Sequence, residues 1–394
     1  MRKATAQQVK EHNRRVVLKA IYEGENISRA ELARLTGLTR PTVSEIVASL
    51  VADGLVREGG LGRSTGGRRP RKLAFLDNSR EVIAIDLGSA SVTGAIVDLR
   101  GRIGERLVLS TDCSKGEQVL EGVYWTADSL LKKATARVVG FGIGTPGLVS
   151  ADSGTVRLGV NLRWYNVPLR KLLEERYGLP VHVANNTNAA AFGERSMGAG
   201  KDCSDMVVIM IGTGIGAGII IDGDIYRGAG GAGEIGHVRI VDGGPLCACG
   251  RHGCLETLAS GAALARRARD AARKHPESLL AGLAGSIQAI SGETVHRAAE
   301  AGDPIARALV EETGHYVGIA VASLVNTLNP KRIVIGGGVA KLGPPLFDSI
   351  RRTVAERALP LLAQETEIVP ASLGSDVGLL GAAALVLAGE LGVV

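Results

Sequence analysis

Three of the five cysteines in the chain lie within eight residues, at Cys247, Cys249 and Cys254, and His237 precedes the first of them by ten residues. Thiolate sulfur and imidazole nitrogen are preferred ligands of Zn²⁺, and a structural zinc site takes four of them in a tetrahedron. The other two cysteines are isolated, which disfavours a disulfide framework. The cluster therefore predicts a zinc site. A reduced cluster without metal, and His252 as the imidazole ligand, are the alternatives that the spacing leaves open.

Apolar segments that end in glycine turns organise the chain after residue 80. Segment 82–86 leads into Leu87-Gly88, segment 206–211 leads into a turn over 212–218, and segment 332–335 leads into three glycines at 336–338. Such turns let backbone N–H groups face a phosphate or another ligand closely, although a tight turn alone also requires glycine. Strands of this kind alternating with helices predict an α/β architecture with parallel strands.

The residues around the first of these turns show the plan in detail. Residues 92–98 and 103–109 are predicted as paired strands, 117–137 as a long amphipathic helix, and 138–144 as a further buried strand. The same order of strand, glycine turn, hairpin, helix and strand recurs from residue 206, without close sequence similarity. The body of the chain is therefore predicted as two halves of related architecture.

Positive charge is concentrated at the start of the chain. Residues 1–80 hold 16 Lys and Arg against 8 Asp and Glu, whereas the remaining residues hold 30 against 32. A basic segment joined to a nearly neutral body favours a nucleic-acid-binding module attached to a second function. A solvated basic tail is the alternative that charge alone leaves open.

The helical pattern of this basic segment is typical of a helix-turn-helix. Residues 5–23 carry apolar side chains at helical spacing, and Ser28 to Glu31 form a capping-box pattern that opens a short helix through Leu35. A turn follows, and a third helix begins near Thr39. An ordinary end of a three-helix bundle is the alternative. The first turns of the third helix are where base edges are met in the major groove, so DNA contacts are predicted for Arg40, Pro41, Thr42, Ser44 and Glu45.

Two short strands around a basic, glycine-rich loop are predicted next, at 55–57 and 71–75. They describe a wing, with a Gly/Arg linker as the alternative interpretation. The arginines of the loop, Arg63, Arg68 and Arg69, are expected to meet phosphates or to enter a narrow minor groove.

Length and composition limit the remaining classes. A chain of 394 residues with 45% apolar residues predicts two or three domains with substantial cores. The polar residues 1–10 lack the apolar core of a signal peptide, and the longest apolar runs are interrupted by glycine or charge. We therefore expect a cytoplasmic protein that does not enter a membrane.

The order and spacing of several motifs resemble the ROK family, named for repressors, open reading frames and kinases. These motifs are Gly144-Thr-Pro-Gly147, Asn161-Leu-Arg-Trp164, Leu179-Pro-Val181, Asn185-Asn186-Thr187-Asn188, the turn 212–218, and the segment from Gly233 to Glu256 that carries the cysteines. The resemblance implies a two-lobed actin/hexokinase-like (ribonuclease H-like) ATPase-type sugar-kinase fold. In the repressor branch of the family it also implies an N-terminal winged helix-turn-helix.

This resemblance sets the expected domains. The winged helix is expected over 1–78, the first ROK lobe over 79–200, and the second lobe with the zinc motif over 201–394. The final helix, about 376–394, is assigned to the second lobe, and its packing back on the first lobe is left open.

The resemblance also assigns the sugar site. It implies that Glu234, His237 and Glu256 hold sugar hydroxyls, and it selects His237 rather than His252 as the zinc ligand. A histidine fixed by the metal through one nitrogen can hydrogen-bond a sugar through the other. Four protein ligands leave no open position, so one structural zinc ion per chain would brace the sugar loop. Gly147 and Asn185 match further sugar-contacting positions.

Two departures from the kinases of the family point away from catalysis. Asn186 stands where those kinases carry the aspartate that takes the proton from the sugar hydroxyl, and an amide cannot take that proton. The first phosphate loop reads Asp86-Leu-Gly88-Ser-Ala, where kinases have Asp-x-Gly-Gly-Thr. We therefore expect no enzyme activity, with Asn186 hydrogen-bonding the sugar, whereas ATP binding stays open because the turn 212–218 is preserved.

The function predicted from these observations is a sugar-responsive repressor of carbohydrate-utilisation genes. A homodimer or homotetramer would bind double-stranded operator DNA, and a sugar in the cleft between the lobes would release it. The first alternative is an active ATP-dependent sugar kinase with an accessory DNA-binding module. The second is a scaffold that binds a transport protein or another partner.

Overall fold

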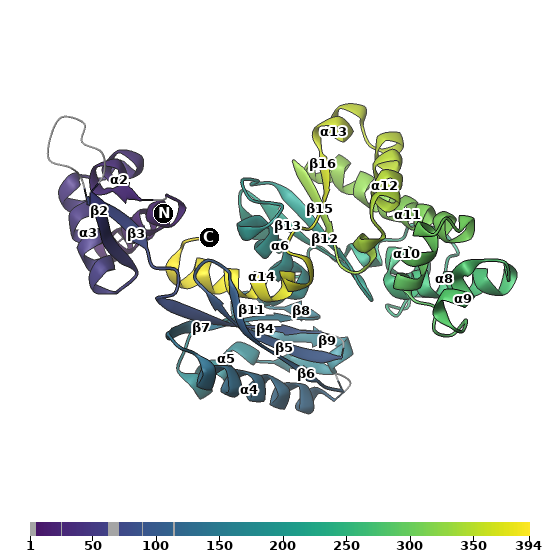
Figure 1. Cartoon of the computed structure of the whole chain (residues 1–394), viewed down its shortest axis with the longest axis horizontal. Coiled ribbons are helices and arrows are strands. Elements are labelled where there is room, and N and C mark those ends of the chain that lie inside the picture. Colours follow the sequence, from purple (N-terminus) through teal and green to yellow (C-terminus); the bar gives the residue numbers. More distant parts are fainter. Residues whose placement is uncertain (1–4, 25, 62–70, 89, 113–114) are drawn as a thin grey trace. The chain divides into compact units, whose positions relative to one another are not determined.

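The computed structural model describes residues 5–24, 26–61, 71–88, 90–112 and 115–394 (Figure 1). The chain divides into two compact units. Unit 1 comprises Met1–Asn185 and Ala382–Val394, and unit 2 comprises Asn186–Gly381. Each unit carries one five-stranded mixed sheet, and unit 1 also carries the N-terminal helices.

The N-terminal part of unit 1 forms the expected winged helix. Each of its three helices begins at a hydroxyl side chain that accepts a backbone N–H, and Ser28 with Glu31 makes the predicted capping box. Leu32, Val43 and Val47 are fully buried between the helices. The elements are α1 (Ala6–Glu23), β1 (Ile27–Ser28), α2 (Arg29–Thr36), α3 (Arg40–Ala52), β2 (Val56–Leu61) and β3 (Arg71–Phe75), and the sheet order is β1-β3-β2.

The large sheet of unit 1 has the order β11-β7-β4-β5-β6. Strands β4, β5 and β6 form an antiparallel meander, whereas β7 and β11 join parallel to β4. Parallel strands need crossover connections, and α4 and α5 provide them on one face of the sheet (Figure 1). The bounds are β4 (Arg80–Leu87), β5 (Ser91–Asp98), β6 (Ile103–Ser110), α4 (Gly116–Lys133), β7 (Arg137–Thr145), α5 (Leu169–Tyr177) and β11 (Val181–Asn185). A small antiparallel sheet adds β8 (Leu148–Val149), β9 (Val156–Gly159) and β10 (Trp164–Val167), with the 3₁₀ turn η1 (Val160–Leu162) between the last two.

Unit 2 repeats this plan with different connections. Its sheet has the order β14-β13-β12-β15-β16, with β12, β13 and β14 antiparallel and with β15 and β16 parallel to β12. The bounds of the strands are β12 (Met206–Ile211), β13 (Ile215–Ile221), β14 (Asp224–Tyr226), β15 (Arg332–Gly336) and β16 (Glu367–Pro370). The helices are α6 (Asn186–Met197), α7 (Leu255–Ala259), α8 (Gly261–Lys274), α9 (Leu279–Ala284), α10 (Gly292–Glu300), α11 (Pro304–Leu328), α12 (Pro344–Arg357) and α13 (Pro360–Glu365), with 3₁₀ turns η2 (Ile235–His237), η3 (Val339–Leu342) and η4 (Gly374–Asp376).

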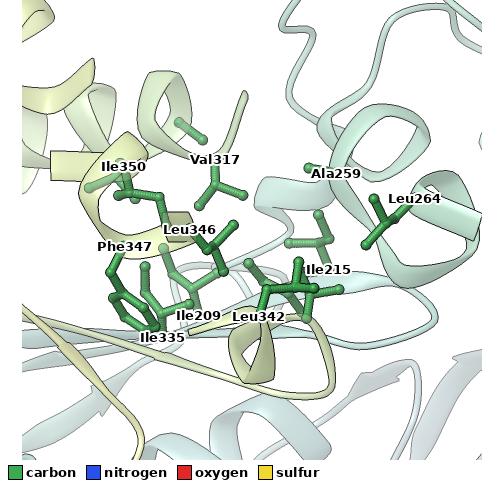
Figure 2. Close-up of a cluster of buried hydrophobic side chains, with 14 of the residues drawn as sticks. Ile209, Ile215, Ala259, Leu264, Val317, Ile335, Leu342, Leu346, Phe347 and Ile350 are labelled. Atoms are coloured by element: carbon green, nitrogen blue, oxygen red, sulfur yellow. The ribbon is translucent and has the colours of Figure 1, made fainter. Parts of the chain in front are cut away.

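The core of unit 2 lies between its sheet and the helices α11 and α12. Ile209 and Ile335 come from neighbouring strands and pack with Val317 of α11 and Leu346 of α12, all nearly free of solvent (Figure 2). Helix α6 packs on β12 and β13. Fixing the central strands in this way also fixes the glycine turn between β12 and β13.

The C-terminal helix α14 (Val377–Val386) continues into a single π-helical turn, η5 (Leu387–Leu391). From Ala382 on it belongs to unit 1, where Gly142 of β7 admits it so closely that an added Cβ would lie 1.9 Å from the Ala382 carbonyl oxygen. The whole segment Gly374–Leu391 is long and apolar enough to cross a membrane, with a mean hydropathy of 1.4, contrary to the expectation from the sequence. Its residues Ala382, Ala383 and Val386 have no exposed surface, as in the core helix of a globular protein.

Two sequence predictions differ from the structure in their bounds. The compact units divide after Asn185 rather than at residue 200, because α6 packs on the sheet of unit 2. The helix expected over 117–137 ends at Lys133, and Arg137 already belongs to β7, where it pairs with Arg80 of β4.

Candidate functional site

Unit 2 brings the four predicted zinc ligands together. The ligand atoms of His237, Cys247, Cys249 and Cys254 all lie within 4.8 Å of one another. Cys247 Sγ is 3.6 Å from His237 Nδ1, and Cys249 Sγ is 3.7 Å from Cys254 Sγ. A tetrahedron with Zn–S of about 2.3 Å and Zn–N of about 2.0–2.1 Å requires about 3.8 Å between sulfurs and about 3.6 Å between sulfur and nitrogen. Three thiols and one imidazole at these separations fit a tetrahedral Zn²⁺ ion.

Short backbone pairings hold this segment in place. Arg239 and Leu246 form antiparallel bridges with Cys254 and His252, respectively, and the Cys247 N–H donates to the Arg251 carbonyl at 2.7 Å. His252 Nδ1 lies 2.9 Å from the Gly244 carbonyl oxygen, and His252 is not in the ligand cluster found among the described residues. The geometry therefore favours His237 as the imidazole ligand.

The thiols of the cluster influence one another. Burial raises the pKa of Cys254 to about 12, and the neighbouring Cys249 and Cys247 thiols add to this shift. The backbone N–H of Arg251 lowers the pKa of Cys249. Thiols this close do not all ionise at neutral pH without a cation among them, because thiolate charges repel one another at short range. This donor set is suited to a metal ion.

His237 is oriented so that its two nitrogens face different partners. Nδ1 faces Cys247, whereas Nε2 lies 4.0 Å from Glu234 Oε2. The side chains of His237 and Glu234 are 39% and 48% exposed, so both are accessible to a ligand. An imidazole fixed through one nitrogen thus presents its other nitrogen beside a carboxylate, which is an arrangement for binding hydroxyl groups.

Glu256 links the cysteine segment to the glycine turn after β12. It stands in the first turn of α7, two residues after Cys254, and its Oε2 accepts a hydrogen bond from the Ile215 N–H at 3.1 Å. Ile215 begins β13 directly after that turn. The carboxylate is partly buried and is held by a backbone group, so its position is fixed before any ligand binds.

Two further predicted residues lie in unit 1. Gly147 has a φ of 100°, and an added Cβ would lie 2.1 Å from the Leu158 carbonyl oxygen, so only glycine fits this position. Asn185, the last residue of β11, donates from Nδ2 to the Gly147 carbonyl at 2.9 Å. Asn185 and Gly147 therefore meet at the carboxyl end of neighbouring strands. Asn186 follows directly as the first residue of α6, in unit 2.

Asp86 marks the predicted first phosphate loop. It lies near the end of β4, opposite Gly144 of β7, and its Oδ1 is buried without a hydrogen-bond partner among the described residues. Burial raises the pKa of Asp86 to about 6. The turn that follows closes with a bond from the Gly88 N–H to the Ser91 carbonyl at 2.8 Å.

The predicted DNA-reading residues stand at the start of α3. Arg40, Pro41 and Ser44 are exposed, whereas Thr42 is partly buried, with its hydroxyl 2.8 Å from that of Thr39. The wing strands β2 and β3 pair in antiparallel fashion as expected. The wing arginines Arg63, Arg68 and Arg69 lie outside the described residues.

Contacts between α1 and α3 were not anticipated from the sequence. Lys10 Nζ lies 3.2 Å from Glu45 Oε1, and Arg14 donates to Ser49 at 2.9 Å and to Asp53 at 2.7 Å. These pairs join residues about 35 positions apart, and only the opposite charges on two helices predicted to pack hinted at them. They place α1 beside the helix that is predicted to read DNA.

Comparisons with known proteins agree with the assignments of the ROK part and of the N-terminal DNA-binding domain. Residues 82–388 match the ROK family, and residues 15–69 match the MarR family. The chain belongs to the ROK family. A putative xylose repressor from Caldicellulosiruptor sp. (strain Rt8B.4) is 34% identical over 388 residues, which is 97% of each protein.

Two solved structures separate the regulators of the family from its kinases. The crystal structure of a ROK family transcriptional regulator, a homologue of the E. coli MLC protein, is 30% identical, covers 98% of both chains and superimposes with a TM-score of 0.87. A ROK family glucokinase from Streptomyces griseus, solved in complex with glucose and AMPPNP, is 36% identical, covers 77% of this chain and 98% of its own, and has a TM-score of 0.71.

The coverage of these matches decides the class of protein. The kinase matches only the ROK part, whereas the repressor and the regulator match along the whole chain, winged helix included. This ROK protein is therefore a transcriptional regulator with a MarR-type DNA-binding domain. The cluster of His237 with three cysteines is typical of the ROK zinc motif.

Proposed function

We propose that this ROK regulator is a repressor that binds operator DNA and releases it when a sugar binds to the ROK part. The observation that carries the proposal is the similarity to a xylose repressor along the whole chain. The braced imidazole and carboxylates of unit 2 supply a chemical reason for a sugar ligand. The sugar can change operator affinity only by as much as it binds the two states of the protein differently.

The residues proposed to bind the sugar carry groups that form hydrogen bonds with its hydroxyls. Carboxylates accept from vicinal hydroxyls, the His237 Nε2–H donates when Nδ1 binds the metal, and side-chain amides do both. The support for this assignment is that the His237 ring is turned with Nε2 toward Glu234, and that Glu256 is held in place by Ile215. The full set is Gly147 and Asn185 of unit 1, with Asn186, Glu234, His237 and Glu256 of unit 2.

The proposed cofactor is one structural zinc ion per chain. His237, Cys247, Cys249 and Cys254 would hold it, and the sulfur and nitrogen separations match a tetrahedral site. Four protein ligands leave no position for a reactive water. The role of the ion is therefore structural: it fixes the ring of His237 and the segment that carries Glu234 and Glu256.

Catalysis is not part of the proposal. Asn186 stands where the kinases of the family carry the proton-accepting aspartate, and an amide cannot replace a carboxylate as a general base. The loop after β4 also lacks the second glycine and the threonine of the kinase pattern. An active sugar kinase with an accessory DNA-binding module is the competing function, and the similarity to a glucokinase over the ROK part is what favours it.

The proposed DNA contacts begin at the N-terminus of α3. Arg40, Pro41, Thr42 and Ser44 would meet base edges in the major groove, and the wing arginines Arg63, Arg68 and Arg69 would meet phosphates or the minor groove. A homodimer or homotetramer would present two such helices to a two-fold operator. We place this regulator in the cytoplasm, where the genes and the sugar are both accessible.

The proposal is tested by thermal unfolding of the purified protein against a panel of sugars, with and without an operator duplex selected from a random pool. Xylose and glucose come first, because the similar repressor and the solved glucokinase are named with them. A ligand of the native state should raise the melting temperature, and the same sugar should lower operator affinity. Sugar turnover with ATP at about 1–100 s⁻¹ would instead identify a kinase.

A further inference from the structure

The winged helix is joined to the rest of unit 1 by a short connection from Phe75, the end of β3, to Arg80, the start of β4. Hydrogen bonds hold this connection on both sides. The Leu76 N–H donates to the Leu55 carbonyl at 2.9 Å, and the Leu99 N–H donates to the Asp77 carbonyl at 3.1 Å. Residues of the winged helix and of the ROK part therefore both fix the connection, which is not a free tether.

The tip of the hairpin between β5 and β6 makes the central contact. The Arg100 guanidinium lies 4.1 Å from the centroid of the Tyr22 ring and 5.4 Å from that of Phe75. Tyr22 of α1 and Phe75 of β3 pack edge to face, with centroids 5.1 Å apart. A cation within about 6 Å of an aromatic face is attracted by the ring quadrupole, and more strongly when water is excluded. Leu99, beside Arg100, is fully buried.

Carboxylates orient this arginine. Arg100 Nε donates to Asp77 Oδ1 at 3.0 Å, and Asp77 belongs to the short connection itself. Asp98 accepts from the backbone N–H groups of Arg100 at 2.8 Å and Arg102 at 2.9 Å, which closes the hairpin turn. The guanidinium is therefore held in one orientation by an ion pair on its edge and by rings at its face.

A second contact joins α1 to the C-terminal segment of the chain. Arg15 donates from Nη2 to the Gly389 carbonyl at 3.0 Å. Gly389 lies in the π-helical turn η5, and Glu390 of the same turn is 2.8 Å from His182 Nε2 of β11. Helix α1 thus contacts the ROK part at two separated points, Tyr22 near its end and Arg15 near its middle.

We propose that Arg100 is a positioning residue for operator recognition, because it clamps Tyr22 and Phe75 and so fixes the direction of the winged helix on unit 1. This inference rests on the proposed function as an operator-binding repressor. Two winged helices must reach two half-sites at a set separation, and fixing each one beforehand reduces the entropy lost on binding. Non-specific binding uses phosphate contacts that require no such separation, so it depends little on the clamp.

The test measures DNA binding of full-length Arg100→Ala by fluorescence anisotropy at one salt concentration. The probes are an operator duplex selected from a random pool with the wild-type protein, and a scrambled duplex of equal length and composition. We expect about tenfold weaker binding to the operator and less than about twofold change with the scrambled duplex. Equal losses on both duplexes, or no loss on either, would overturn the clamp. If the wild-type protein selects no duplex at all, the proposed function itself fails.

Matched variants separate the clamp from general effects. Arg102→Ala removes the same charge from the same hairpin and an exposed ion pair with Asp77 at 3.5 Å, but its 70% exposed side chain is not stacked on the rings, so operator affinity should stay within about twofold. Tyr22→Leu should reproduce the loss, and combining it with Arg100→Ala should weaken binding no further, since both remove one contact.

Hydrogen exchange shows whether the winged helix itself stays folded. In Arg100→Ala, amides of the connection between Phe75 and Arg80 should exchange faster, whereas protected amides of α1 and α3 should exchange at wild-type rates. If exchange instead rises equally throughout α1 and α3, the variant unfolds the domain, and Arg100 is a fold residue rather than a positioning residue.

Discussion

Replacing Glu256 by glutamine should weaken sugar binding while leaving the fold and the zinc content unchanged. The Glu256 Oε2 accepts the Ile215 N–H at 3.1 Å, and a glutamine carbonyl oxygen can accept the same hydrogen bond. The side chain keeps its volume, so the packing at the start of α7 is preserved. What the variant loses is the negative charge that would accept hydrogen bonds from sugar hydroxyls.

The size of the effect follows from the strength of hydrogen bonds to charged groups. Such a bond contributes about 1.5–3 kcal/mol net, which corresponds to a dissociation constant about 10 to 150 times larger. At a sugar concentration of about 100 times the wild-type dissociation constant, the ligand stabilises the wild-type protein by about 2.7 kcal/mol. A variant that binds about 100 times more weakly gains only about 0.4 kcal/mol under the same conditions.

The assay compares the rise in melting temperature with and without the sugar that the panel identifies, together with release of the operator duplex. Asp242→Asn is the matched control, since Asp242 also lies in the cysteine segment but is 95% exposed and pairs only with Arg239 among the ion pairs of the described residues. It should respond to sugar like the wild type. If Glu256→Gln retains the full thermal shift and releases DNA at the same sugar level, the assignment of the pocket is wrong.

Three further outcomes are expected. His237→Ala and Cys249→Ser should each lose the zinc that metal analysis finds in the wild type, at about one ion per chain, whereas His252→Ala should retain it; loss of zinc in His252→Ala would reverse the choice of imidazole. Arg40→Ala should weaken operator binding by about 1–3 kcal/mol in an anisotropy titration, with exposed Arg34 on α2 as the control; equal affinity of wild type and Arg40→Ala would remove Arg40 from the interface. Burial raises the folded pKa of Asp86 to about 6 from 3.8, so its contribution to stability is present below about pH 4 and lost as the pH rises through 6. The difference in free energy of unfolding between Asp86→Asn and the wild type, measured by urea titration, should therefore be up to about 3 kcal/mol more favourable to the variant at pH 8 than at pH 4. Parallel pH profiles of the two proteins would contradict the burial of that charge.

The sequence predicted the parts of the molecule that depend on contacts between residues close together in the chain. The Ser28 and Glu31 capping box, the helix start at Thr39 and the wing strands follow from side chains within a few positions of one another. The cysteine cluster is predictable for a similar reason, because few arrangements of three thiols in eight residues serve anything but a metal. The spacing of the cysteines indicated a metal site, whereas the choice of His237 over His252 needed the family resemblance, and the structure then brought the four ligand atoms together.

Features that depend on contacts between distant residues were not predictable from the sequence. The division after Asn185 follows from packing of α6 on β12 and β13, and Ala382 lies on β7 because Gly142 leaves room for it. The contact of Arg100 with Tyr22 joins the tip of the β5–β6 hairpin to α1, and no sequence pattern links these two elements. A single arginine in a nearly neutral part of the chain carries no signal until the Tyr22 and Phe75 rings and the Asp77 carboxylate are placed around it.

The glycine turn between β12 and β13 shows why a preserved motif need not imply a preserved ligand. A Cβ at Gly214 would lie 2.5 Å from Glu256 Oε2, one at Gly216 would lie 2.6 Å from Thr187 Oγ1, and one at Gly218 would lie 2.3 Å from the Ala191 Cβ. Gly216 and Gly218 are therefore tightly enclosed by α6, whether or not a phosphate ever approaches the turn, whereas a side chain at Gly214 would displace the carboxylate of Glu256. Gly216 and Gly218 consequently carry no weight in favour of nucleotide binding, and the absence of catalysis is argued from Asn186 and from the loop after Asp86.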